Sequence, residues 1–268
     1  MTSVYAHMAY VNRDDGNLGD KMGFHIADWM LGSASYQRLG LKNLDQVDER
    51  TVAIVGSLVA ALVDKECNIV GGGLINANSR KYSSSLRVSV VRGFLTKSVI
   101  QRDSPLHRPL VIGDPGLLLS ELELMPYQHD KADLGFIIHD VDRDAFFMKY
   151  PNLAHNVIDN YAPRSEFVEQ LSRYRAVAST SLHGCIFCHS YGIPVAPFVL
   201  TDKVYGGDFK FEDYYSSYGL NVTRRPLAGS ADRILSMIHS APQPYVSRVA
   251  DMKLAQIDLI DRALHGRD

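Results

Sequence analysis

Short apolar runs rich in β-branched residues recur along the chain, with helical segments between them. Buried strands of this length that alternate with helices are typical of parallel α/β layers, so the pattern predicts an α/β fold. The predicted strands are 3–11, 51–57, 67–73, 86–93, 109–114, 133–139, 175–180 and 195–200. The predicted helices are 20–31, 94–101, 143–150, 165–174, 183–191, 231–240 and 249–266.

The pattern also suggests where the chain divides. Around residues 123–133 it lapses into polar and turn-forming residues. We place a domain boundary there, which gives a first lobe at 1–125 and a second lobe at 126–268. The second lobe includes the last helix, 249–266, whose apolar stripe is suited to docking on a core.

Composition and charge exclude some classes of function. With 46% hydrophobic and 22% charged residues, the 268-residue chain is of the ordinary globular type. Its 30 acidic and 28 basic residues form no polybasic block, which argues against a nucleic-acid binder. The three cysteines are sparse, which is typical of a protein in a reducing compartment. The first residues show neither the basic end nor the long apolar segment of a signal peptide, so we predict a cytoplasmic location.

Residues 176–201 carry no formal charge and have the length of a membrane span, about 20 residues. Their serines, histidines, glycine and proline would lack partners in lipid, so we predict a buried strand–helix–strand unit. Within it, Cys185 and Cys188 lie one helical turn apart beside apolar neighbours. That placement favours a role in the core over a zinc site.

The loops that follow the strands are the expected ligand site, because the carboxyl ends of parallel strands form the crevice in such sheets. They are "DDGNLGD" (14–20), "GGGLIN" (71–76), "VRG" (91–93), "GDPG" (113–116), "HDVDRD" (139–144) and "STSLHG" (179–184). "GGGLIN" is not a dinucleotide fingerprint, because Asn76 stands where the third glycine belongs and no acidic residue follows at the ribose-binding distance.

Other loops leave two readings open. Asp20 is either the N-cap of a helix or part of a backbone nest that binds substrate. Asp140 and Asp142 form a D-x-D motif that fits a metal site or, more simply, a solvated strand end with Asp142 as a helix cap. His183 stands where a strand meets a helix, either as a capped structural histidine or as a proton donor beside an anion pocket.

Six of these motifs, taken in order, resemble the polysaccharide pyruvyl transferase family. They are "NLGD", "GGGLIN", "VVRG", "GDPGLLL", "GFIIHD" and "STSLHGCIFCHSYGIPV". The subgroup that attaches ketal pyruvate to bacterial exopolysaccharides of the xanthan type looks most similar, and "GGDFKFEDYYSSYG" (206–219) is similar to its members. The resemblance runs from about residue 12 to about residue 220, and the ordered set is more specific than any one motif.

The resemblance implies two Rossmann-like lobes in a GT-B-like arrangement. The first lobe would face the acceptor, and the second would bind the donor, phosphoenolpyruvate. Pyruvate would pass to a sugar of an exopolysaccharide repeat unit or a lipid-linked oligosaccharide, with ketal formation and phosphate release. Neither a cofactor nor a metal is expected, nor is nucleic acid. The location would be cytoplasmic, with peripheral contact at the inner face of the membrane left open.

By the same resemblance, His183 corresponds to the family's donor-site histidine. This chain departs from the family at Ser181 and His139, where many members have arginine. A trianionic donor still needs positive charge, so Arg92 and Lys210 are the first candidates and Arg143 the next. The full set of expected roles is catalytic for His183, Asp20 and His139, donor-binding for Arg92, Lys210, Ser181, Leu182 and Gly184, and acceptor-binding for Asn17, Gly72, Gly73, Asn76 and Glu212.

Two other functions fit the same fold. One is a GT-B glycosyltransferase that uses a nucleotide sugar, for which Glu212 is the candidate ligand of the ribose. The other is a non-catalytic sugar-binding relative, favoured by the two missing arginines. The acceptor sugar, the ketal position and the oligomeric state are left open.

Overall fold

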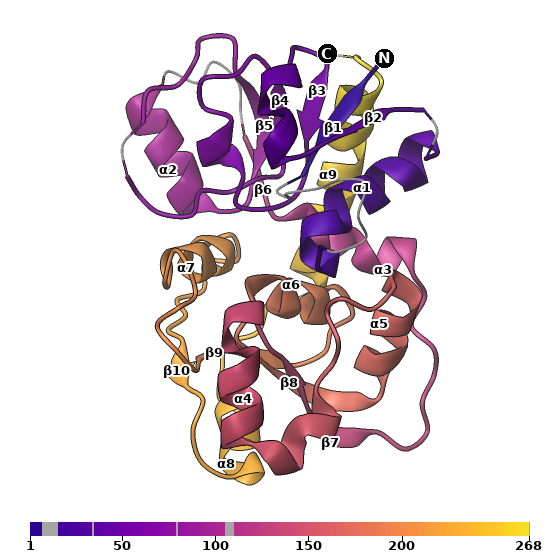
Figure 1. The fold of residues 1–268 in the computed structure, drawn as a ribbon, viewed down its shortest axis with the longest axis vertical. Coiled ribbons are helices and arrows are strands. Elements are labelled where there is room, and N and C mark those ends of the chain that lie inside the picture. The colour runs from indigo at the N-terminus through magenta and orange to yellow at the C-terminus, as the bar shows by residue number, and fades with distance from the viewer. Residues whose placement is uncertain (7–15, 34, 79, 105–109, 268) are drawn as a thin grey trace.

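The protein folds into two lobes, each built on a parallel sheet (Figure 1). The computed structural model describes residues 1–6, 16–33, 35–78, 80–104 and 110–267. Within these residues the first sheet has the order β2(Gln37–Leu39)-β1(Ser3–Tyr5)-β3(Thr51–Ala53)-β4(Asn68–Val70)-β5(Arg87–Val91)-β6(Val111–Ile112). The second has the order β10(Arg225–Pro226)-β9(Val195–Val199)-β8(Tyr174–Ser179)-β7(Ala132–Ile137). The predicted α/β fold with two Rossmann-like lobes is confirmed.

Helices connect the strands and cover the sheets. The α-helices of the described residues are α1(Leu18–Leu31), α2(Phe94–Asp103), α3(Leu119–Leu122), α4(Arg143–Lys149), α5(Arg164–Ser172), α6(Leu182–Ser190), α7(Phe209–Ser216), α8(Ala231–His239) and α9(Val246–Leu264). Short 3₁₀ segments are η1(Leu41–Gln46), η2(Val59–Ala61), η3(Pro115–Leu118), η4(Asp140–Asp142) and η5(Pro151–Asn156). Since the sheets are parallel, each strand needs such a crossover before the next.

Each predicted strand overlaps an observed one, although residues 7–11 and 109 of the predicted strands lie outside the described residues. The predicted helices are also present, with ends shifted by a few residues. The pattern missed the short helix α3, the edge strands β2 and β10, and helix α7. Both edge strands are only two or three residues long, with a single buried residue in β2 and none in β10, so they lack the apolar run that identifies a buried strand.

The uncharged stretch 176–201 forms the core of the second lobe. It comprises β8, α6 and β9, in which Cys185, Ile186 and Cys188 are fully buried. The predicted strand–helix–strand unit is therefore confirmed, and both cysteines lie in the core. Among the helices described, none combines the length and apolar character needed to cross a membrane.

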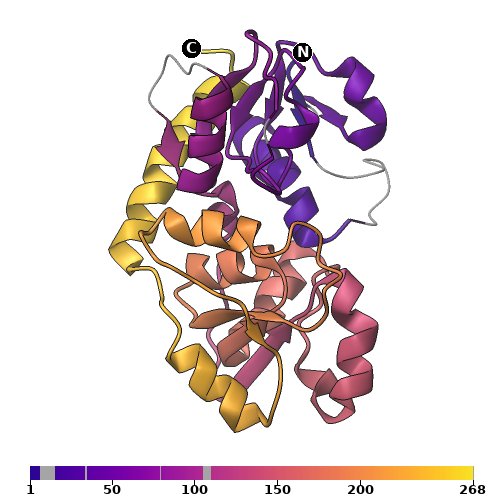
Figure 2. The same ribbon diagram turned by 90° about the vertical axis from the view of Figure 1, so that its left-hand side faces the viewer.

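The C-terminal helix α9 returns to the first lobe. It packs against β4, β5, β6 and α1, and Figure 2 shows it running along the side of the molecule next to the first sheet. Its buried face includes Val249, Met252 and Ile260. In space, therefore, the end of the 126–268 segment completes the core of the first lobe.

Candidate active site

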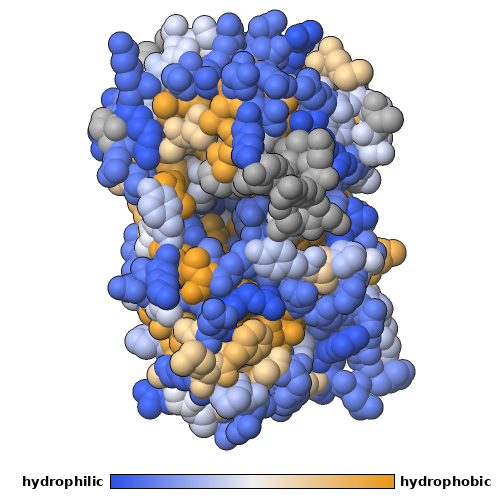
Figure 3. Space-filling view, viewed as in Figure 1, coloured by the Kyte–Doolittle hydropathy of each residue, from blue (hydrophilic) through white to orange (hydrophobic). Residues whose placement is uncertain are grey.

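A cavity of about 420 Å³ lies where the two lobes meet. The space-filling view shows the surface hollowed at this level (Figure 3). Several lining residues follow β3, β7 and β8, as the rule for parallel sheets predicts. The lining consists of Asn17, Asp20, Val55, Gly56, Ser57, Ala60, Ala61, Ile75, Arg80, Arg92, His139, Asp140, Asn160, Ser181, Leu182, His183, Tyr205 and Lys210.

His183 lies at the start of α6, pressed against helix α1 of the other lobe. A Cβ atom at Gly19 would come 2.0 Å from its Nδ1, so the glycine of "NLGD" makes room for the imidazole. On its other side the ring stacks on Phe187 at a centroid distance of 5.9 Å. Burial, followed by the charges of Lys210 and Arg92, lowers the pKa of His183 to about 3. The free protein therefore holds His183 neutral at physiological pH.

The start of α6 also offers backbone donors. Ser181 occupies the N-cap position of this nine-residue helix, but its side chain makes no capping bond, and its own amide donates to Ser179 Oγ at 3.1 Å. The first amides of a helix have no partner within it and favour negative charge. Ser181, Leu182 and His183 all line the cavity.

Carboxylates gather at one end of the cavity. Asn17, the N-cap of α1, accepts a hydrogen bond from the amide of Asp20 at 3.1 Å, so the reading of Asp20 as the N-cap is wrong. The Asn17 side chain donates to Asp20 Oδ2 at 2.8 Å and, across the lobes, to Asp140 Oδ2 at 3.5 Å. Burial and the nearby charge of Asp140 raise the pKa of Asp20 to about 7. Asp20 therefore titrates near neutral pH.

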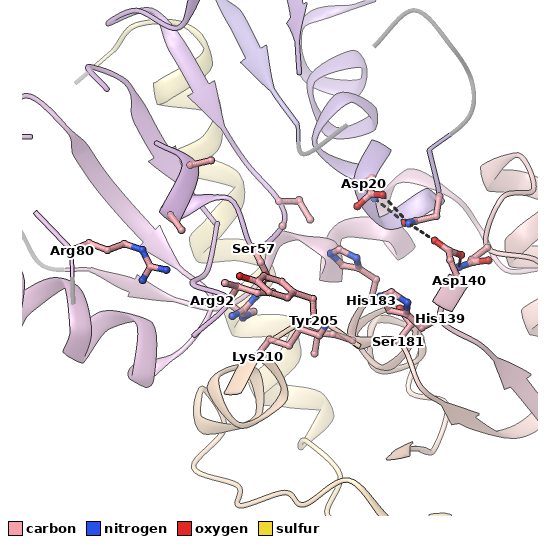
Figure 4. A pocket seen from close by; sticks show the side chains of 18 residues that line it. Asp20, Ser57, Arg80, Arg92, His139, Asp140, Ser181, His183, Tyr205 and Lys210 are labelled. Carbon is pink, nitrogen blue, oxygen red and sulfur yellow. Dashed lines mark hydrogen bonds between the residues drawn. The ribbon is translucent and has the colours of Figure 1, made fainter. Parts of the chain in front are cut away.

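Lys210 extends into the cavity from α7. Lys210 is only 8% exposed, yet its Nζ forms no hydrogen bond or ion pair with the described residues. Burial, followed by the charges of Arg92 and Arg224, lowers the pKa of Lys210 to about 8. Helix α7 places the ammonium at the cavity (Figure 4).

Arg92, in contrast, is saturated with partners. It is 1% exposed, and its Nε donates to Asp213 Oδ2 at 2.9 Å. Its Nη1 donates to Ser57 at 2.9 Å and its Nη2 to the Leu74 carbonyl at 2.5 Å. Gly73 gives the guanidinium its space, because a Cβ there would lie 2.3 Å from Cζ. Asp213 also accepts from the Thr96 amide and hydroxyl at 2.7 Å each, which fastens α7 to the first lobe.

In the segment that follows β7, residues 139–142, some side chains line the cavity and others are buried in the interior. His139 caps η4, with its Nδ1 accepting from the Val141 amide at 3.4 Å, and burial lowers its pKa. Asp140 lines the cavity, whereas Asp142 is fully buried and accepts from the Thr201 hydroxyl at 2.5 Å. Asp142 occupies the N-cap position of α4, as one reading predicts, but it makes no capping bond and is not solvated. No cluster of three or more potential metal ligands occurs in the described residues.

The structure brings eight of the expected site residues to the cavity lining: Asn17, Asp20, Arg92, His139, Ser181, Leu182, His183 and Lys210. The others lie outside it. Gly72 and Gly184 are packing positions, where a Cβ would meet Leu58 at 2.7 Å and Ser179 Oγ at 2.3 Å. Gly73 adjoins Arg92, Asn76 accepts a hydrogen bond from Arg80, and Glu212 is exposed on α7.

Several residues that line the cavity belong to none of the sequence motifs named above. Ser57 is the last residue of the predicted strand 51–57, so the rule of carboxyl ends could have found it. Arg80 and Tyr205 lie in irregular segments, and Asn160 follows no strand. Beside the cavity, Arg224 has a buried Nη1 without a partner in the described part of the chain and lies over the ring of Phe211.

Comparison with known proteins gives one family. "Uncharacterized protein L143" of Acanthamoeba polyphaga mimivirus is 30% identical over 175 residues, which is 62% of this chain and 59% of that protein. The chain thus spans about three fifths of the length of this curated relative. No solved structure gave a significant match. The family model for polysaccharide pyruvyl transferase matches residues 33–201, the larger part of the chain, and the protein therefore belongs to the polysaccharide pyruvyl transferase family.

Proposed function

We propose that the cavity binds phosphoenolpyruvate and that the protein transfers its pyruvyl group, as a ketal, to two hydroxyls of one sugar. The observation that carries the proposal is the Lys210 ammonium, which lines the cavity and forms no ion pair or hydrogen bond with the residues described. A buried, unpaired charge is costly unless a ligand neutralises it. A phosphate or carboxylate would do so.

The donor would lie between Lys210 and the start of α6. There the ammonium and the backbone amides at the start of α6, where Leu182 and His183 line the cavity, would supply donors for its anionic groups. Lys210 would take the place of the arginines that many family members have at positions 139 and 181. Residue 210 lies beyond the range that the family model matches, so this role is proposed from the structure of the chain itself.

The reaction needs one proton delivered to carbon and two removed from hydroxyls. Protonation of the donor's methylene carbon creates a cationic centre, and the first hydroxyl oxygen bonds to it and loses its proton. The bond from carbon to the phosphate oxygen then breaks. The second hydroxyl adds to the same carbon, and its proton leaves with the phosphate. The products are the ketal and inorganic phosphate.

His183 is the proposed proton donor. A bound trianion raises the pKa that Lys210 and Arg92 depress, so the donor itself promotes protonation of the imidazole. Asp20 is the proposed base, because its pKa of about 7 matches that role near neutral pH. His139 suits a hydrogen-bond donor better, since its Nδ1 already accepts from a backbone amide and the proton stays on Nε2.

The acceptor would be a sugar of an exopolysaccharide repeat unit or a lipid-linked oligosaccharide, as in the xanthan-type subgroup. The acceptor would enter from the first lobe, in a GT-B-like arrangement, with Asn17 and Asp20 near its hydroxyls. The reaction would occur in the cytoplasm, where a lipid-linked acceptor brings the protein to the inner face of the membrane. A nucleotide-sugar transferase has less support, because Glu212 is exposed and does not line the cavity.

The test is phosphate release from phosphoenolpyruvate across a panel of lipid-linked oligosaccharides, with mass spectrometry of the products. We expect equal amounts of phosphate and ketal product with one acceptor. His183→Ala should lose this activity, whereas His239→Ala, at an exposed position on α8, is the matched control. Binding of phosphoenolpyruvate without phosphate release from any acceptor would instead support the non-catalytic relative.

A further inference from the structure

The outer part of the cavity, on the first-lobe side, has a different character from the donor region. Its wall includes Val55, Ala60, Ala61 and Ile75, so it is largely apolar. Arg80 is the basic side chain of this part. In Figure 4 its guanidinium points toward the cavity from beyond Ser57 and Arg92, on the side away from His183. A three-carbon phosphate ester at α6 would leave this part free.

The backbone amide of Arg80 donates to Asp103 Oδ2 at 2.8 Å, whereas the hydrogen bonds of its guanidinium go to neutral groups. Its Nη2 donates to Asn76 Oδ1 at 2.9 Å, and its Nη1 donates to the Asn78 carbonyl at 2.8 Å. It forms no ion pair with a carboxylate in the described residues. A guanidinium that is oriented but not neutralised is suited to bidentate binding of a carboxylate or phosphate.

Tyr205 adds an aromatic surface to the same cavity. It is 74% exposed and lines the cavity, although the neighbouring Val204 is buried. The following Gly206 has a φ of 83° and comes so close to the first lobe that a Cβ would lie 2.6 Å from the Ile75 carbonyl. The backbone thus fixes the segment that bears the ring, and an exposed ring at the edge of the cavity is suited to cover the apolar face of a sugar.

We propose that this part of the cavity is the acceptor subsite and that the acceptor is an anionic saccharide. Arg80 binds its carboxylate or phosphate, and Tyr205 stacks on a sugar ring. The proposal rests on the proposed function, because it treats the donor region at Lys210 as occupied by phosphoenolpyruvate. It commits the acceptor to a chemical class that the family assignment does not give.

Three ligands of similar size separate the sources of charge: phenyl β-D-glucoside, phenyl β-D-glucuronide and phenyl β-D-glucoside 6-phosphate. Dissociation constants are measured by ligand-observed NMR without donor, for the wild type, Arg80→Gln, Tyr205→Ala and Tyr205→Phe. Arg50→Gln is the matched control, since Arg50 is exposed, pairs with Asp48 and does not line the cavity. Phosphoenolpyruvate binding is measured for each protein in parallel.

We expect the wild type to bind at least one anionic ligand about tenfold more tightly than the glucoside, and Arg80→Gln to remove that preference. The better anionic ligand identifies a uronate or a phosphate as the source. Tyr205→Ala should weaken all ligands alike, and Tyr205→Phe should not. Equal affinities in the wild type, no binding of any ligand, or a preference that survives in Arg80→Gln would overturn the inference. A wild-type protein that does not bind phosphoenolpyruvate would instead overturn the proposed function.

Discussion

The hydrogen-bond network around Arg92 and the cavity around Lys210 adjoin each other, yet they differ in how many partners each gives a buried positive charge. Arg92 bonds to Asp213, Ser57 and the Leu74 carbonyl. Lys210 bonds to none of the residues described, and its pKa falls to about 8. A buried charge with partners serves the fold, and one without partners is available to a ligand. We therefore expect Arg92 to support the fold and Lys210 to bind the donor.

The largest expected effect is on stability, at Arg92. Arg92→Met should reduce the free energy of unfolding by about 3–5 kcal/mol, because it leaves the Asp213 carboxylate buried without its partner. Denaturant titration measures the change. Lys210→Met is the matched variant and should leave stability unchanged or raise it, since the buried ammonium has no ion pair to lose. Equal destabilisation by the two variants would contradict the comparison.

The next effect is on turnover, at His183. His183→Ala should lower kcat by about 10²-fold, as the loss of a positioned acid does. The protein should remain folded with a modestly lower melting temperature, because the variant loses the stacking of the ring on Phe187 but no hydrogen bond to a described residue. His239→Ala provides the control. Unchanged turnover in a folded His183→Ala protein would remove the imidazole from the mechanism.

A smaller effect is the pH dependence of kcat/KM. Asp20 must be ionised to act as a base, so activity should rise as the pH increases through about 7. Lys210 must be protonated to bind the donor, so activity should fall as the pH increases through about 8. The result is a narrow bell-shaped profile. A profile that keeps its alkaline limb in Lys210→Arg, whose guanidinium stays protonated, would assign that limb to another group.

The smallest expected effect is at Asp140. Its negative charge helps to raise the pKa of Asp20, so Asp140→Asn should move the acidic limb of the profile to lower pH. The amide keeps the shape of the side chain and its place near Asn17. Initial rates between pH 5 and 8 measure the shift. An acidic limb that stays in place would show that Asp20 does not produce it.

Much of the fold was predictable, because buried parallel strands are continuous apolar runs such as those of β7, β8 and β9. Helix α7 was not. Its buried residues include Lys210 and Asp213 beside Phe211, so its sequence lacks a clear apolar face. The helix depends on the bond between Asp213 and Arg92, which lies 121 residues away in the chain. Long-range contacts of this kind leave no local pattern.

The site was predictable to a similar degree. His183 was found because the junction of a strand and a helix is a recurrent place for ligand binding. Asp20 and Lys210 were candidates because they lie within motifs. The sequence could not show that the Arg92 side chain has hydrogen-bond partners whereas that of Lys210 has none among the described residues. That difference depends on which partners the fold brings to each charge. Arg80 and Tyr205 reach the cavity through irregular segments whose course no periodicity predicts.

The most direct test of the central claim is calorimetric titration of phosphoenolpyruvate into the wild type and Lys210→Met at pH 7, below the pKa of about 8 at which the ammonium loses its proton. Lys203→Met, at an exposed position on the segment before α7, is the matched control. We expect Lys210→Met to weaken binding by about 10- to 100-fold and the control to bind as the wild type does. Affinity within twofold of the wild type in a folded Lys210→Met protein would contradict the account.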